Sequence, residues 1–160
     1  MIFGQFLDSI LEKIEIVVEF SPQNNEALEA LDHTVVLTLN GSRYQILEDR
    51  YPNPSIWLID DETPIVVGDF HDDGTRFFFV EAIPEFLSLP SRIVSISEFE
   101  DEFEFVGCEI LLDDGSGFSI LTHPEDILLK EPGAVWKWCQ EWVIPPMSKL
   151  TVTNINRRLR

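Results

Sequence analysis

The spacing of apolar residues near the start of the chain predicts a helix. These residues recur with the 3.6-residue period of an α-helix, while Asp8 and Glu12 fall on the opposite face. The apolar positions are Ile2, Phe3, Phe6, Leu7, Ile10, Leu11 and Ile14. We therefore expect an N-terminal amphipathic helix that packs its apolar face on a sheet.

A second helical pattern follows Pro132 and ends at the Ile144-Pro145-Pro146 run, because proline removes a backbone donor and interrupts a helix. Its apolar residues are Ala134, Val135, Trp138, Cys139 and Trp142. We predict a C-terminal Trp-rich helix here. Trp136 points away from the apolar stripe, so it is expected to be exposed.

Between these segments the pattern is mostly that of strands. Asn40-Gly41 separates two β-prone runs, 33–39 and 42–47, and this is a strong hairpin signal. Thr75–Glu81 contains three consecutive phenylalanines and predicts a central strand buried on both faces. Further strands are expected at Glu15–Phe20, Ser55–Ile59, Ile65–Val67, within Arg92–Leu112 and at Gly117–Leu121, with a short helix from Ser21 to Leu31.

Together these elements predict an α+β fold, a mainly antiparallel sheet with an N-terminal amphipathic helix and a C-terminal Trp-rich helix. The length of 160 residues fits a single domain over 1–160. A sub-domain break near Pro90 stays open, and 148–160 is expected to form a tail. Strands and helices do not alternate regularly, which argues against a doubly wound parallel sheet.

The charge narrows the possible partners. There are 29 acidic residues against 11 basic ones, a formal net charge of −18. Such a balance excludes a general affinity for nucleic acid or an anionic membrane. It also raises solubility, so the charge by itself does not identify a partner.

Cysteines and hydropathy predict the compartment. The chain has two cysteines, Cys108 and Cys139, and no run of 18 apolar residues. The first residues include Asp8 and Glu12 and lack the basic, then apolar, sequence of a signal peptide. We expect a cytoplasmic protein with reduced thiols and no membrane contact.

The most acidic stretch carries the main candidate site. Its glutamates alternate with apolar residues, and as a strand they would form a row about 20 Å long on one face. The row consists of Glu98, Glu100, Glu102 and Glu104. It would fit a basic groove on another protein. A helix with Ile96, Phe99 and Phe103 on one face, or a merely solvated sheet face, are the alternatives.

Acidic turns are candidate cation sites. The carboxylates concerned are Asp69, Asp72, Asp73, Asp113 and Asp114. Ca²⁺ takes six to eight oxygen ligands from such loops, yet none of these turns matches an EF-hand. Asp-Gly is also a preferred turn pair, so we favour a turn role and predict no cofactor, with Ca²⁺ as the alternative.

No catalytic motif is present. The sequence lacks phosphate-binding loops, a nucleophile elbow and zinc-ligand spacings, and its histidines are scattered. We therefore expect a non-catalytic protein that occludes a basic site on a partner protein, with Glu98, Glu100, Glu102 and Glu104 in contact and Trp136 as a possible anchor. In charge and size it is similar to immunity proteins, antitoxins and nucleic-acid mimics. A cation-binding protein and an enzyme of unrecognised class are the alternatives.

Overall fold

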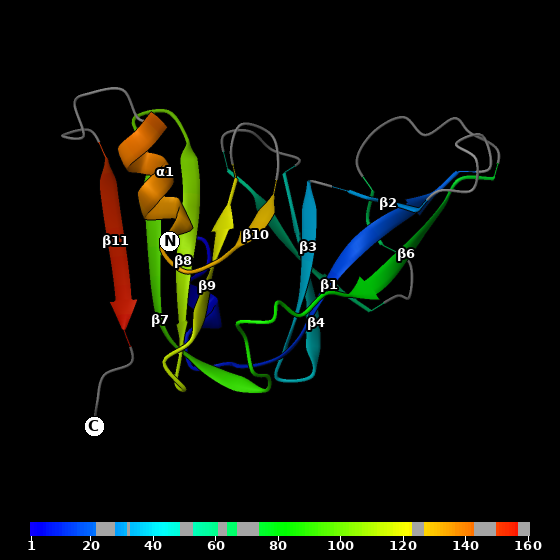
Figure 1. Cartoon of the computed structure of the whole chain (residues 1–160), viewed down its shortest axis with the longest axis horizontal. Coiled ribbons are helices and arrows are strands. Elements are labelled where there is room, and N and C mark those ends of the chain that lie inside the picture. The colour runs from blue at the N-terminus through cyan, green and yellow to red at the C-terminus, as the bar shows by residue number, and fades with distance from the viewer. Residues whose placement is uncertain are drawn as a thin grey trace.

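The computed structural model describes residues 1–21, 28–31, 33–48, 53–60, 64–66, 74–122, 127–142 and 150–156, and most of them form antiparallel strands (Figure 1). In chain order the elements are η1 (Gly4–Phe6), β1 (Ile10–Phe20), β2 (Leu28–Ala30), β3 (Thr34–Leu39), β4 (Ser42–Leu47), β5 (Ser55–Ile59), β6 (Arg76–Glu81), β7 (Ser91–Glu100), β8 (Phe105–Leu112), β9 (Gly117–Leu121), β10 (Leu128–Lys130), α1 (Ala134–Trp142) and β11 (Thr151–Asn156).

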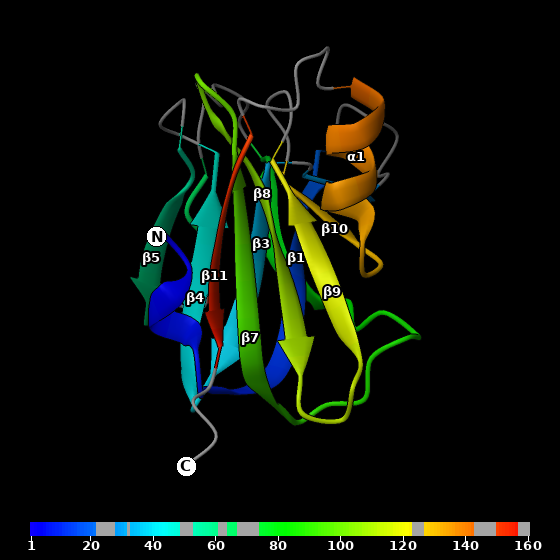
Figure 2. The same cartoon turned by 90° about the vertical axis from the view of Figure 1, so that its left-hand side faces the viewer.

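The strands form two sheets that meet at β1. In the first sheet β1 pairs with β2, β3 and β6, and β3 continues to β4 and β5. The second sheet has the order β11-β7-β8-β9-β10. Ile10 and Leu11 at the start of β1 pair with β7 and join the two sheets. Figure 2 shows the long strands of both sheets running roughly parallel or antiparallel to one another.

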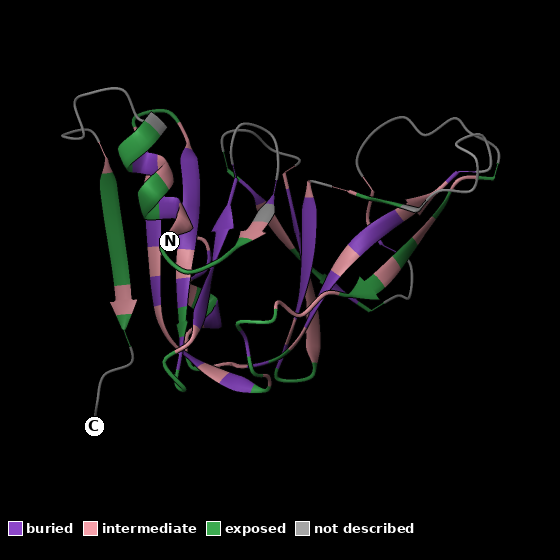
Figure 3. Ribbon diagram, viewed as in Figure 1, coloured by how far each residue is buried: buried purple, intermediate pink, exposed green. Residues whose placement is uncertain are grey.

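The main core lies between the two sheets, where the buried segments of the strands face one another (Figure 3). Its largest fully buried side chains include Phe3, Phe6, Phe105 and Phe118. Each such side chain contributes roughly 1.5–3 kcal/mol when it leaves water. Helix α1 covers the opposite face of the second sheet, with Val135 and Cys139 packed among Phe99, Val106 and Leu121.

The predicted N-terminal helix is wrong. The segment contains only the single 3-10 turn η1, a left-handed residue at Asp8 (φ 68°), and then strand β1. The apolar residues that suggested a helix are nevertheless buried in the main core, among them Phe3, Phe6, Leu11 and Ile14. The β-branched residues of β1 and its pairing with four strands favour the extended conformation.

Without that helix, the predicted α+β fold class is also wrong. Among the described residues, 55% lie in strands and 9% are helical, and α1 is the one helix of seven or more residues. The described part of the chain is therefore mostly antiparallel sheet. Helix α1 occupies the segment in which the sequence predicts a Trp-rich helix. The Asn40-Gly41 hairpin is confirmed, since β3 and β4 pair with Leu39 opposite Ser42 and both turn residues have positive φ.

Strand β6 is not the doubly buried strand that its three phenylalanines predicted. Phe77 and Phe79 pack in a small cluster with Val17, whereas Phe78 is 45% exposed on the other face. Among the strands that the structure describes, β6 pairs with β1 alone. Phe78 and Val80 are exposed on the same face of β6, which no local pattern in the sequence indicates.

Candidate functional site

The structure does not bring the four predicted glutamates into one row. Strand β7 ends at Glu100, and residues 101–104 connect it to β8. Glu98 is only 1% exposed and accepts hydrogen bonds from the backbone N–H groups of Ile2 (3.0 Å) and Phe3. Glu98 is therefore part of the core, and the accessible acidic residues are those at and beyond the end of β7.

The β7–β8 turn, residues 100–104, is held by one aspartate. The carboxylate of Asp101 accepts the N–H groups of Phe103 (2.7 Å) and Glu104 (2.8 Å), and its own N–H donates to the Glu104 carbonyl at 3.0 Å. This arrangement fixes the backbone that carries Phe103. The Phe103 side chain is 76% exposed and is the most exposed large apolar side chain among the described residues. Sequence reasoning missed it, because a strand would have turned Phe103 inward.

Trp136 lies on α1 beside the same end of β7. Its side chain is 43% exposed, as its position off the apolar stripe predicted, and its ring centroid is 6.2 Å from that of Phe99. Phe99 directly precedes the β7–β8 turn. Both cartoon views place this turn and the C-terminal end of α1 at the same end of the second sheet (Figures 1 and 2). Trp136, in the first turn of α1, is connected to this end of the sheet by its ring contact with Phe99.

A glutamate from β8 positions the helix that carries Trp136. The carboxylate of Glu109 accepts the N–H groups of Gly133 (2.8 Å), Val135 (3.1 Å) and Trp136 (3.3 Å). The hydroxyl of Ser119 lies 2.8 Å from the same carboxylate. Glu109 thus satisfies donors that the first helical turn leaves open, and its charge interacts favourably with the helix dipole.

Replacement of Glu109 by alanine is expected to lower the free energy of unfolding by about 2 kcal/mol, since one helix cap contributes about 0.5–2 kcal/mol and charged hydrogen bonds somewhat more. Urea titration followed by tryptophan fluorescence measures the loss. Glu131→Ala is the matched control, because that exposed residue precedes the same helix and its side chain forms no hydrogen bond or ion pair with the described residues. A loss no larger than that of Glu131→Ala would contradict the capping role.

Of the predicted cation ligands in acidic turns, Asp113 and Asp114 are described, and both carboxylates accept backbone hydrogen bonds. A carboxylate oxygen of Asp113 accepts the N–H of Arg92 at 3.1 Å, and Asp114 accepts the N–H of Ser116 at 2.9 Å. Hydrogen bonding by Ser116 lowers the pKa of Asp114. Asp69, Asp72 and Asp73 lie outside the described residues. Within the described ranges no group of three or more potential metal ligands comes together.

Both thiols are free and protonated at neutral pH. Burial raises the pKa of Cys108 well above its usual value, and the charges of Glu98 and Glu109 add to this rise. Burial, followed by the charges of Asp101 and Glu109, raises the pKa of Cys139 to about 11. Because the thiolate is the reactive form, neither residue has the electrostatic surroundings of a catalytic cysteine.

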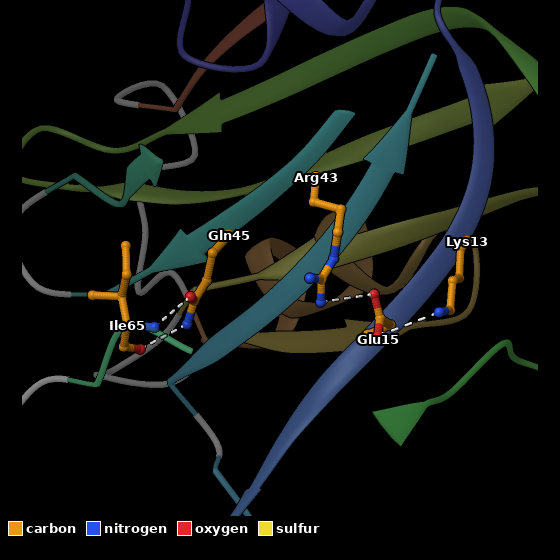
Figure 4. A network of polar contacts seen from close by, with 5 residues as sticks. All are labelled: Lys13, Glu15, Arg43, Gln45 and Ile65. Atoms are coloured by element: carbon orange, nitrogen blue, oxygen red, sulfur yellow. Dashed lines mark hydrogen bonds and ion pairs between the residues drawn. The ribbon is translucent and has the colours of Figure 1, made fainter. Parts of the chain in front are cut away.

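A polar network crosses the face of the first sheet opposite the main core (Figure 4). The nearly buried carboxylate of Glu15 is 3.2 Å from Arg43 and 3.5 Å from Lys13, and the Arg43 guanidinium lies 4.1 Å from the centroid of the Phe79 ring. Beside it, the Gln45 side chain donates to the Ile65 carbonyl (2.7 Å) and accepts the Ile65 N–H (2.8 Å). These contacts connect strands and a loop, and no pattern in the sequence indicates them.

The chain matches no protein-family model, and neither the curated proteins nor the solved structures include a significant match. Within the described part of the chain, no helix is long and apolar enough to cross a membrane.

Proposed function

We propose that the protein is a non-catalytic binding protein whose β7–β8 turn docks on a basic site of a partner protein and blocks that site. The observation that carries this proposal is the 76% exposure of Phe103 on a backbone fixed by Asp101. Exposing a large aromatic side chain to water is unfavourable unless a partner covers it. A fixed turn also loses little conformational entropy on binding.

The charge around Phe103 defines the partner's chemistry. Four of the five residues 100–104 are acidic, in a chain with a net charge of −18. Such a surface accelerates encounter with a positively charged protein, and the acceleration falls as salt screens it. The second aromatic anchor is Trp136, whose ring packs near that of Phe99, the residue directly before the turn. Direct nucleic-acid binding is not part of the proposal, because the same charge repels phosphate.

The Phe103→Ala variant is expected to lose at least about 30-fold in affinity for the partner, the effect of a hot-spot residue worth about 2 kcal/mol. The measurement is affinity capture from the source cells at low ionic strength, followed by titration of the captured basic protein. Glu102→Gln should mainly slow association and flatten its salt dependence.

Phe86→Ala and Glu85→Gln are the matched controls. Both residues are exposed, and both lie in the segment between β6 and β7 rather than in the β7–β8 turn. Glu98 is left unchanged in all variants because its carboxylate is part of the core. Equal loss of affinity in Phe103→Ala and Phe86→Ala, or recovery of no basic protein, would overturn the proposed function.

A further inference from the structure

The pairing of β7 with β8 shifts by one residue directly beside the β7–β8 turn. Phe99 is paired with Gly107. The next residue, Glu100, is paired with Phe105. Val106 is therefore the extra residue of a β-bulge on β8, and the end of the hairpin is out of phase with the rest of it. Such a bulge changes the face to which the residues beyond it point.

The burial of the two residues beside the bulge shows this change of face. In an unbroken strand Val106 would lie on the same face as Cys108, because residues two apart share a face. Val106 instead packs in the cluster beneath α1, whereas Phe105 lies in the main core with Cys108. The bulge thus turns the Phe105 ring inward, directly after the turn that carries Phe103.

The N-terminal segment supplies a contact for the inward Phe105 ring. The Phe3 ring is fully buried, and its centroid lies 5.7 Å from that of Phe105. Hydrogen bonds from the Ile2 and Phe3 N–H groups to the Glu98 carboxylate hold this segment against β7. Phe3 therefore contacts both strands of the hairpin, β7 before the register shift and β8 beyond it.

We propose that Phe3 is a positioning residue for the β7–β8 turn, because its ring selects the bulged register of the hairpin end over the regular one. In the regular register Glu100 would pair with Val106, and the Phe105 ring would point to the face opposite the main core. That ring would then lose its contact with Phe3. Burial of the two rings offsets the cost of the bulge, which leaves one residue outside the ladder.

The register in turn determines the backbone that exposes Phe103. The N–H of Asp101 donates to the Glu104 carbonyl at 3.0 Å, and its carboxylate accepts the N–H groups of Phe103 and Glu104. In the regular register Asp101 would pair with Phe105, and the connection between the strands would be one residue shorter. These hydrogen bonds would then be lost. The effect on binding rests on the proposed function, whereas the register is a property of the chain alone.

The variant Phe3→Ala tests the inference, with Phe118→Ala as its matched control. Both rings are fully buried in the main core, so the two substitutions remove the same group from the same interior. Phe118 lies on β9 and is paired with Ile110, toward the end of β8 that is far from the turn. A general loss of core packing therefore affects both variants, and a loss of positioning affects only Phe3→Ala.

Cross-strand nuclear Overhauser effects in the full chain report the register without any partner. Backbone contacts between Glu100 and Phe105 identify the bulged register, and those between Glu100 and Val106 identify the regular one. In Phe3→Ala we expect the first contacts to be lost and the second to appear, while Phe118→Ala keeps the wild-type contacts. If an alanine variant does not fold, Phe3→Leu and Phe118→Leu make the same comparison with a smaller cavity, and Phe3→Leu should weaken the first contacts.

Binding to the basic protein captured from the source cells gives the second readout. Phe3→Ala should weaken it at least about 10-fold, because the turn is no longer preorganised, and Phe118→Ala by less than about 3-fold. Wild-type contacts between Glu100 and Phe105 in the folded Phe3 variant would overturn the inference, as would the same loss of contacts in the Phe118 variant. Recovery of no basic protein would overturn the proposed function, while the register would still decide the role of Phe3.

Discussion

Replacement of Glu98 by alanine is expected to lower the free energy of unfolding by about 3 kcal/mol, because it leaves buried backbone donors without an acceptor at about 1–3 kcal/mol each. The Glu98 carboxylate is 1% exposed and accepts the N–H groups of Ile2 and Phe3, which lie some 95 positions away in the sequence. The carboxylate therefore fastens the N-terminal segment to β7. Urea denaturation followed by tryptophan fluorescence measures the loss.

Two further variants separate this role from a general effect of charge. Glu98→Gln should lower the free energy of unfolding less than Glu98→Ala does, since the amide keeps one acceptor oxygen for the two donors. Glu85→Ala, which removes an exposed carboxylate between β6 and β7, should change the free energy of unfolding by no more than about 0.5 kcal/mol. If Glu98→Ala and Glu85→Ala had the same effect, the fastening role of Glu98 would be refuted.

Replacement of Gly107 by alanine should destabilise the protein by about 3 kcal/mol or more, because the added methyl group has no room in a packed interior. A Cβ atom at Gly107 would overlap the Ile120 carbonyl oxygen of β9 and would lie 2.8 Å from the Val135 side chain of α1. The clash therefore pushes β9 and α1 away from β8. Thermal unfolding, together with the near-ultraviolet circular dichroism of the α1 tryptophans, would report both consequences.

Gly115→Ala is the control for the backbone alone. Gly115 has a φ of +85°, and nothing lies within 4 Å of an added Cβ. Gly115→Ala should therefore lower the free energy of unfolding by about 1–2 kcal/mol, because only the left-handed backbone conformation is unfavourable for alanine. A smaller loss for Gly107→Ala than for Gly115→Ala would show that the contact between β8, β9 and α1 is looser than the structure has it.

Only part of the candidate site could be predicted from the sequence. The alternation of glutamate and phenylalanine indicated the acidic stretch, and the helical pattern after Pro132 placed Trp136 outside the apolar stripe. Neither pattern contained the turn that exposes Phe103, because that turn depends on two hydrogen bonds to Asp101 rather than on periodicity. The role of Glu109 was hidden for a similar reason, since its donors belong to a helix more than 20 residues away.

What the sequence by itself determined was local: the hairpin at Asn40-Gly41, where positive φ is needed, the segment of α1, and the excess of negative charge. The tertiary structure decided what covers each face. The apolar residues between Phe3 and Ile14 fit a helix in isolation, but they become a 3-10 turn and a strand because β3, β6 and β7 supply the missing backbone partners of β1. Glu98 is buried and Phe78 is exposed for the same physical reason, which is that burial depends on neighbours brought in from distant parts of the chain.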